Sequence, residues 1–149
     1  MPTKTGYMLR PRTDVKKGSK YRGLSGSKYG NRRTQVDGIW FDSKGEAEHY
    51  KILKLREEAG EIHSIELQPG FRFMHKGEYL KMRSKGYPNG RTIKYKADFS
   101  FIENGKRVVQ DFKGYDTDVS RLKRALVELF HGIRIQIITV PGGKPFNDF

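Results

Sequence analysis

The chain has 149 residues, and its 30 lysines and arginines outnumber its 17 aspartates and glutamates to give a net charge of +13. This length suits one domain with a modest core, and the basic excess predicts binding to polyanions such as nucleic acid. The absence of cysteine from the sequence excludes thiol catalysis, disulfides and cysteine-ligated zinc. The sequence has neither an apolar run long enough to cross a bilayer nor a hydrophobic signal core, so we expect a cytoplasmic protein without a membrane partner.

Residues 1–35 form a strongly basic segment in which glycine and serine are frequent and apolar side chains are few. Such a composition cannot build a packed core, so we expect a flexible arm here and a folded domain over residues 36–149. The segment either serves only solubility or wraps around DNA through basic side chains that include Lys28, Arg32 and Arg33.

Periodicity and turn residues divide the rest of the chain into short elements. We expect strands over residues 35–41, 62–73 (broken at Pro69-Gly70), 92–101 and 133–140, helices over 43–59 and 118–131, and a hairpin or loop over 77–90. The second helix carries an apolar stripe that includes Leu122 and Leu129, which is typical of a helix packed on a core. The order of the elements predicts an α/β fold with a mixed β-sheet flanked by helices.

The clearest local signal is a β-hairpin. Residues 92–101 alternate between polar and apolar side chains, and Asn104-Gly105 is the pair that favours a two-residue type I′ turn. With that turn, Asp98 lies opposite Asp111 on the polar face. Opposed Cβ atoms lie roughly 4.5–5.5 Å apart, and like charges at that distance destabilise a sheet. A divalent cation between the two carboxylates would remove this repulsion, so the pair is a candidate metal site.

Lys113 follows Asp111 by two residues and is expected on the same face, opposite Lys96 in this register. An ammonium group there can orient a water molecule or stabilise the charge that develops when a phosphodiester is hydrolysed. The carboxylates and the main-chain carbonyl of Phe112 are oxygen ligands of the kind that Mg²⁺ prefers. The alternative interpretation is an ordinary surface strand in which Asp98 is neutralised by Lys96 or Lys113.

A third carboxylate is expected from the first helix. Glu46 shares a helical face with Tyr50 and Leu53 and would lean over the sheet, where a metal would offset the cost of its burial. Glu46 also stands three residues after Ser43, which fits a capping box in which it only accepts a main-chain amide. Glu48, on another stripe of the helix, is the competing candidate.

Other polar residues carry weaker signals. Lys96, Lys123 and Arg124 are candidates for contacts with DNA phosphates. The four histidines lack metal-ligand spacing and are expected at the surface. Gln68 either contacts the site or the main chain, or is only a turn residue. The glycine-rich stretches do not form a phosphate-binding loop, so we expect no nucleotide cofactor.

Three short motifs in this order resemble the PD-(D/E)XK nuclease superfamily: Ser43-x-x-Glu46, Tyr95-x-Ala97-Asp98-Phe99 and Asp111-x-Lys113. The chain departs from that pattern at Ala97, where a proline usually stands. The stretches FDSKGEAEHY, ELQP, YKADF and VVQDFKG are more closely similar to a phage-encoded family described as a domain of unknown function, over about residues 29–140. The superfamily resemblance implies a restriction-endonuclease-like core, Glu46, Asp98 and Asp111 as ligands of Mg²⁺ (with Mn²⁺ as a substitute), and Lys113 as the catalytic lysine.

The size, the basic charge and the likeness to a phage family are similar to the endonuclease-I type of Holliday-junction resolvase. This resemblance implies Mg²⁺-dependent cutting of branched DNA in phage DNA metabolism by a homodimer, in the cytoplasm of a bacterial host. Two alternatives stay open. One is a PD-(D/E)XK nuclease directed to DNA ends or to a sequence, and the other is a DNA-binding module without catalysis.

Overall fold

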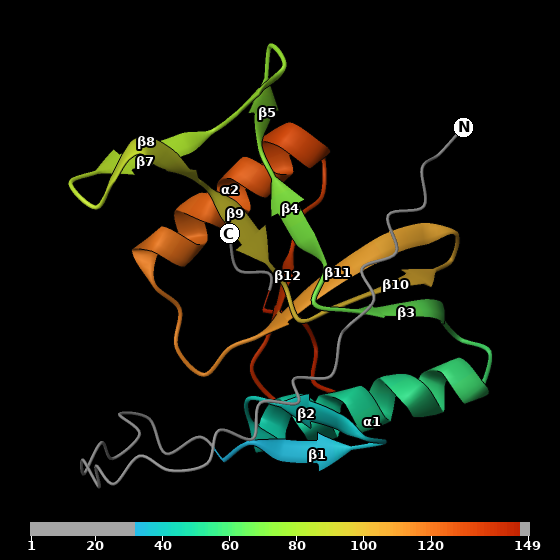
Figure 1. Ribbon diagram of the computed structural model, residues 1–149. Helices are drawn as coiled ribbons and strands as arrows, with labels where there is room; N and C mark the ends of the chain where they lie inside the picture. The colour runs from blue at the N-terminus through green and yellow to red at the C-terminus, as the bar shows by residue number, and fades with distance from the viewer. Residues whose placement is uncertain (1–31, 147–149) are drawn as a thin grey trace, which may run out of the picture. The chain divides into compact units, whose positions relative to one another are not determined.

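The computed structural model describes residues 32–146, which form a β-sheet with one helix on each face and several short hairpins (Figure 1). The helices are α1 (Lys44–Glu58) and α2 (Asp118–His131). The strands are β1 (Thr34–Val36), β2 (Ile39–Phe41), β3 (His63–Leu67), β4 (Gly70–Arg72), β5 (Met74–His75), β6 (Glu78–Tyr79), β7 (Lys81–Ser84), β8 (Tyr87–Thr92), β9 (Lys94–Lys96), β10 (Phe99–Glu103), β11 (Lys106–Phe112) and β12 (Gln136–Ile138). Most of the basic segment over residues 1–35, including Lys28, lies outside the described residues.

The four-stranded sheet has the order β12-β11-β10-β3, and only β12 runs parallel to its neighbour. This arrangement confirms the α/β fold with a mixed sheet flanked by helices. Asn104 and Gly105 both have positive φ (50° and 74°), as a type I′ turn requires, and they join β10 to β11. The register that follows from this turn is confirmed from the pair Glu103–Lys106 to the pair Phe99–Gln110.

The strand expected over residues 35–41 is instead a small hairpin of β1 and β2. Asp37 and Gly38 have φ angles of 51° and 77°, so the Asp-Gly pair forms a second turn of the same kind. Thr34–Val36 is already strand, so the boundary expected at residue 35 falls within β1.

The strand expected over residues 92–101 bends out of the sheet at Asp98. β9 ends at Lys96, pairs with β4 and places Lys96 opposite Gly70, so the predicted pairing of Lys96 with Lys113 is wrong. The partner ribbon bends at the same level, because Gln68 takes a φ of 54° and Pro69 has no amide hydrogen to extend a ladder. Two main-chain bonds cross-link the bend: the amide of Gln68 donates to the carbonyl of Asp98 at 2.8 Å, and the amide of Ala97 donates to the carbonyl of Pro69 at 3.0 Å.

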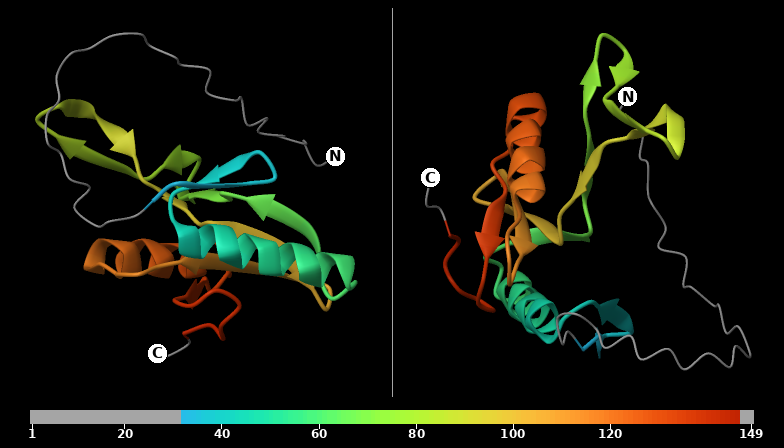
Figure 2. Two further views of the ribbon diagram at one scale, coloured as in Figure 1. Left: turned by 90° about the horizontal axis from the view of Figure 1, so that it is seen from below. Right: turned by 90° about the vertical axis from the view of Figure 1, so that its left-hand side faces the viewer.

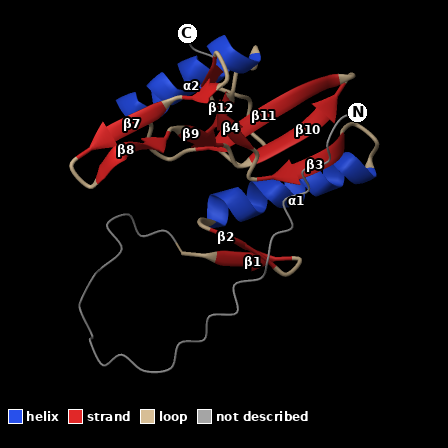
Figure 3. Cartoon of the chain, turned by 45° about the horizontal axis from the view of Figure 1, so that its top comes forward, coloured by secondary structure: helices blue, strands red, loops and turns tan. Residues whose placement is uncertain are grey.

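Two apolar clusters fix the helices on opposite faces of the sheet, and Figures 1 and 3 show α1 and α2 on either side. The cluster under α1 consists of Phe41, Ala47, Tyr50, Leu53, Ile62, Phe99 and Phe101. The cluster under α2 consists of Phe71, Phe73, Tyr95, Ala97, Val109, Val127, Ile135 and Ile137. Burial of this apolar surface is the main source of the fold's stability.

The bounds of α2 agree with the sequence prediction, because Thr117 caps its start and Gly132 ends it with a left-handed φ of 66°. The expected packing of its apolar stripe is wrong in part. Leu122 and Leu129 are 63% and 78% exposed, whereas Val127 is fully buried, so the helix is rotated away from the predicted face. The last strand, β12, covers Gln136–Ile138 and is shorter than the strand predicted over residues 133–140. Neither described helix is long and apolar enough to cross a membrane.

Residues 73–93 form what we call the β-arm, which contains β5 to β8 and leaves the sheet through β4 and β9 (Figures 1 and 2). Its two hairpins are joined by main-chain bonds. The amide of Leu80 donates to the carbonyl of Phe73 at 2.7 Å, and the amide of Ile93 donates to the carbonyl of Leu80 at 2.9 Å. A hairpin was one of the two conformations expected for residues 77–90, and the structure contains one from β7 and β8.

Candidate active site

The carboxylate of Asp98, where the sheet bends, has two further carboxylates beside it, each from a different element. Asp98 lies in the bend between β9 and β10, Asp111 is near the end of β11, and Glu46 lies in the first turn of α1. The carboxyl group of Asp98 interacts with both of the others. Burial, and then the nearby carboxyls of Asp111 and Glu46, raise the pKa of Asp98 far above the usual range of an aspartate. The structure therefore places two of the acidic residues that the sequence selected, Glu46 and Asp111, each beside the third, Asp98.

Each of these carboxylates is also held by a neighbouring group through one oxygen. The amide of Phe112 donates to Oδ2 of Asp98 at 2.7 Å, and the amide of Asp42 donates to Oε2 of Glu46 at 3.0 Å. The hydroxyl of Tyr95 donates to Oδ2 of Asp111. Main-chain and tyrosine donors thus fix the direction of the carboxylates.

Glu46 reaches the site because α1 starts very close to the end of β11. A Cβ atom on Gly45 would lie 2.5 Å from the ring of Phe112, so only glycine permits this approach. The capping interpretation is partly right: Ser43 Oγ accepts the amide of Glu46 at 3.1 Å, while Glu46 accepts the amide of Asp42. Capping and proximity to Asp98 are therefore compatible.

Glu48, the competing candidate, points elsewhere. Its Oε1 lies 3.0 Å from Nζ of Lys51, and its side chain is 41% exposed. Of the two helix carboxylates, the structure places only Glu46 beside Asp98.

Lys113 lies at the edge of the carboxylate cluster. Its Nζ is 3.1 Å from Oδ2 of Asp111, which is itself 6% exposed, and its amide donates to the carbonyl of Ile138 at 2.9 Å. Strand β12 therefore fixes the main chain of Lys113, while Asp111 fixes its ammonium group. A cation at this position can meet the negative charge of a phosphate that approaches the carboxylates.

Behind Asp111 lies a second layer of polar groups that the sequence did not reveal. The hydroxyl of Tyr95 bonds both Asp111 and Arg124, and Arg124 makes two bonds of 2.8 and 2.6 Å to the carboxylate of Asp116. Burial, and then Asp111, raise the pKa of Tyr95, so its hydroxyl remains a donor. In the alternating pattern of residues 92–101 Tyr95 counts as an apolar position, and such a pattern carries no information on its hydroxyl group.

The placement of Arg124 corrects the expectation that it lies at the surface for phosphate contact. Its side chain is only 15% exposed and its guanidinium is engaged by Asp116 and Tyr95. The hydrogen bond to Asp116 raises the pKa of Arg124 and lowers that of Asp116, as expected for a bidentate ion pair. Arg124 is thus a support for Tyr95 within the described structure.

His49 is buried, which makes the prediction of a surface position wrong for this histidine. Its Nδ1 accepts the amide of Gly142 at 3.0 Å, so its Nε2 carries the proton and donates to Oε1 of Gln110 at 2.8 Å. Gln110 continues to Gln136 through a bond of 2.9 Å. Burial lowers the pKa of His49, consistent with a neutral ring. This chain ties α1 to β11 and β12 directly beside Asp111.

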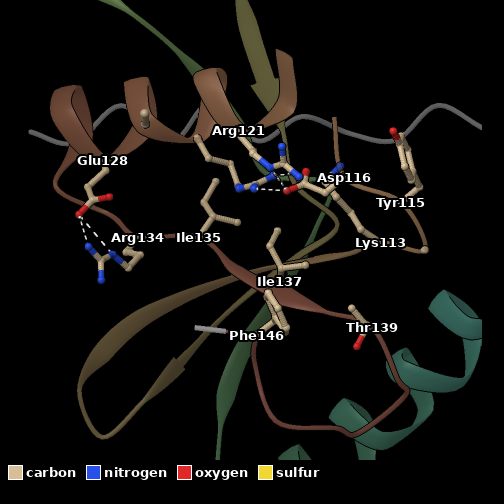
Figure 4. Close-up of a pocket in the computed structure, with 13 residues that line it drawn as sticks. Lys113, Tyr115, Asp116, Arg121, Glu128, Arg134, Ile135, Ile137, Thr139 and Phe146 are labelled. Atoms are coloured by element: carbon tan, nitrogen blue, oxygen red, sulfur yellow. Dashed lines mark hydrogen bonds and ion pairs between the residues drawn. The ribbon is translucent and has the colours of Figure 1, made fainter. Parts of the chain in front are cut away.

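A pocket of about 640 Å³ opens beside Lys113 on the α2 side of the sheet (Figure 4). In Figure 4, Lys113 and Asp116 lie toward one end and the ion pair of Glu128 with Arg134 toward the other. Ile135 and Ile137 form part of its apolar wall. The pocket is lined by Lys113 but not by Glu46, Asp98 or Asp111, so it lies beside the carboxylates and not over them.

The remaining candidates for DNA contact are scattered. Arg32 and Lys96 are exposed, and Lys96 immediately precedes the bend. Arg33 pairs with Asp42 at 3.8 Å and lies over the ring of Trp40. Lys123 is half-buried on α2. Of these four residues, only Lys96 is close in the sequence to one of the carboxylates, Asp98.

The chemistry of the carboxylates suits a metal ion, but their present spacing does not. Among residues 32–146, no three histidine, aspartate or glutamate side chains stand close enough together to hold a metal ion as they are placed. Asp98 is the shared neighbour of the other two carboxylates, and Glu46 turns one oxygen toward its own helix cap. The donor set still suits a hard cation, because a cation would relieve the charge repulsion that raises the pKa of Asp98.

Comparison with known proteins gives one match. No curated protein and no solved structure matches the chain. The model of a family described as "Protein of unknown function (DUF1064)" matches residues 26–140, which include Glu46, Asp98, Asp111 and Lys113. This match agrees with the resemblance to a domain of unknown function and spans well over half of the sequence, so the chain belongs to the DUF1064 family.

Proposed function

We propose that this protein is a metal-dependent DNA endonuclease of the PD-(D/E)XK type. The observation that supports the proposal most strongly is the position of Glu46 and Asp111 beside Asp98 at a sheet bend, with Lys113 bonded to Asp111. Three carboxylates brought together at a partly buried site are unfavourable for stability alone, because burial and mutual repulsion both oppose their ionisation. A function that needs them ionised accounts for their presence.

In this proposal Glu46, Asp98, Asp111 and the carbonyl of Phe112 would hold Mg²⁺, with Mn²⁺ as a substitute. The bound cation would supply Lewis acidity toward water and the scissile phosphate. The protein's own groups do the positioning. Lys113 orients the attacking water or stabilises the negative charge on the phosphate, and Tyr95 keeps Asp111 turned toward the site.

The proposed substrate is branched DNA of the Holliday-junction type, cut by a homodimer in phage DNA metabolism within a bacterial cytoplasm. The net charge of +13 supports a polyanionic substrate, and the size, the basic charge and the likeness to a phage family, which are similar to those of junction-resolving nucleases, support the branch preference. A nuclease with end or sequence preference would use the same carboxylates. The Asp111–Lys113 ion pair also fits a DNA-binding module without catalysis, in which these charges only neutralise each other.

The test is DNA cleavage in Mg²⁺ by the parent protein beside Asp111→Asn, Glu46→Gln and Glu48→Gln. We expect the first two variants to lose roughly 10³-fold or more in rate, since each removes a charge from the reacting centre. Glu48→Gln is the matched control and should cut at the parent rate, because Glu48 pairs with Lys51 in solvent. Full activity of Asp111→Asn would refute the proposed site. Loss of cleavage in Glu48→Gln but not in Glu46→Gln would show that Glu48, and not Glu46, is the helix ligand.

A further inference from the structure

The β-arm carries an unusual concentration of positive charge. Residues 73–93 contain five lysines and arginines and a single acidic residue, Glu78. Three more basic residues lie at its base, on the strands that connect it to the sheet: Arg72, Lys94 and Lys96. A second copy of such an arm would repel the first, so the charge favours a polyanion as the partner.

Beyond its base at Phe73 and Ile93, which pack on the cluster under α2, the β-arm is poorly packed. All four residues of β7 are exposed, although successive side chains of a strand point to opposite faces, so neither face of this strand is covered. Large apolar side chains are exposed along the arm: Met74, Tyr79, Leu80, Met82 and Tyr87. An isolated two-stranded hairpin is only marginally stable in water. Exposure on both faces leaves the ribbon of β7 and β8 open to a partner.

The two faces of this ribbon differ in chemistry. Lys81 and Arg83 share one face of the ribbon, and Gly90 on β8 lies against both. A Cβ atom added to Gly90 would lie 2.9 Å from Cβ of Lys81. The other face carries Met82 opposite Arg91, and the guanidinium of Arg91 lies 5.7 Å from the ring centroid of Tyr87. A basic face backed by an aromatic–cationic face is suited to phosphates on one side and base edges on the other.

We propose that the β-arm is a DNA-binding element whose β7–β8 ribbon enters the major groove of a duplex. The major groove admits a two-stranded β-ribbon, and Lys81, Arg83 and Lys85 would contact its flanking phosphates. The choice of DNA as the partner rests on the proposed nuclease function. The charge and the exposure of the arm are properties of the structure and do not depend on that proposal. This surface is distinct from Lys123 and Arg124, to which the sequence pointed.

The arm is continuous in the chain with the carboxylate site, which sets where on the DNA it binds. Lys85 at the ribbon tip precedes Asp98 by 13 residues. At about 3.3 Å per extended residue, the tip reaches no more than about 43 Å from the bend. One turn of B-DNA is about 34–36 Å long. The arm therefore contacts duplex within about one helical turn of the phosphate to be cut.

The experiment is equilibrium binding of the full-length protein to a duplex of about two helical turns, measured by fluorescence anisotropy in chelator. The arm variant K81Q/R83Q/K85Q is compared with the control variant K51Q/K106Q/K144Q, which removes the same charge from exposed positions elsewhere. Raising the salt from ~50 to ~200 mM weakens DNA binding by both variants. Because the arm variant lacks three phosphate contacts, its fold-loss of affinity should be roughly 40 times smaller than that of the control. Equal melting temperatures of the two variants check that both remain folded.

Each outcome decides the inference. A weaker salt dependence in the arm variant alone supports it, and identical salt dependence in both variants overturns it. The same measurement is repeated with an RNA duplex of equal length. A binding defect of the arm variant with RNA but not with DNA overturns the inference as well. Because binding is measured without metal, the nuclease proposal fails separately: Asp111→Asn cutting like the parent would refute that proposal while the arm result stands.

Discussion

The main sheet and the β-arm belong to one antiparallel ribbon, yet they are stabilised very differently. Where β3 pairs with β10, Phe99 and Phe101 are each 1% exposed and lie under α1. Beyond the bend the ribbon continues through β4 and β9 into the β-arm, where Met82 is 61% exposed. The difference shows that main-chain pairing alone does not make a core; covering helices do.

The boundary between these two regions is also where the carboxylates lie. The bend moves Asp98 out of the regular ladder, so its side chain accepts the amide of Phe112 and meets Asp111 and Glu46. A continuous strand would have kept Asp98 in a cross-strand pair on one face. The packed half thus supplies rigid support for the site, while the exposed half supplies surface for a partner.

The comparison predicts a large difference in stability between equivalent truncations. Phe99→Ala should lower the free energy of unfolding by about 3–5 kcal/mol, because it leaves a cavity between α1 and the sheet. Tyr87→Ala in the β-arm should change it by less than about 0.5 kcal/mol, since its ring is 53% exposed. Urea unfolding measures both. Similar losses in the two variants would mean that the arm is packed in solution.

A glycine substitution tests how closely the packed half must fit. Gly45→Ala should reduce DNA cleavage roughly 10²-fold, because the new Cβ atom would push the ring of Phe112 and move Glu46 from Asp98. Gly86→Ala in the β-arm is the control, since a Cβ atom there would meet nothing within 4 Å. Undiminished cleavage by Gly45→Ala would show that the approach of α1 to β11 does not matter for activity.

The tyrosine behind Asp111 should have a smaller effect. Tyr95→Phe removes the hydroxyl that bonds Asp111 and leaves the ring in place, so we expect activity to fall roughly 10- to 100-fold with little change in stability. Tyr79→Phe, in the β-arm, should cut at the parent rate. A parent-like rate for Tyr95→Phe would mean that Lys113 and the main chain suffice to orient Asp111.

The smallest expected effect is the pH dependence contributed by His49. Burial lowers its pKa in the folded protein below the 6.5 of a free histidine, so the unfolded chain binds the proton more readily. Stability from this group is fully present above pH 6.5 and is lost as the pH falls through the lowered pKa. His49→Gln should lose less stability than the parent over that acidic range in urea unfolding. An equal or larger acid loss in His49→Gln would contradict this assignment.

Local signals in the sequence were sufficient for turns, helix ends and the proximity of two carboxylates to Asp98. Asn104-Gly105 fixed the register of β10 and β11, and the cap residues located α2, because both depend on a few neighbouring residues. The helical face of Glu46 indicated that it lies over the sheet, and the structure places it, and not Glu48, beside Asp98; its role as a metal ligand stays a prediction.

The features that the sequence did not reveal depend on contacts between distant segments. The bend at Asp98 arises because Gln68 and Pro69 interrupt the partner strand, which alternation within residues 92–101 cannot show. The burial of His49 requires Gln110 and Gly142, and that of Arg124 requires Asp116 and Tyr95. Spacing predicted an apolar stripe on α2 but not which part of it meets the sheet.

The central claim is that the carboxylates at the bend make this protein a metal-dependent nuclease. The most direct measurement is cleavage of an end-labelled four-way DNA junction and of its matching linear duplex by the purified full-length protein, in Mg²⁺ and in chelator. We predict paired cuts near the branch that require Mg²⁺, and little cutting of the duplex. Equal cutting of both substrates would keep the nuclease site and remove the junction preference. Tight DNA binding without any cutting in Mg²⁺ or Mn²⁺ would contradict the claim.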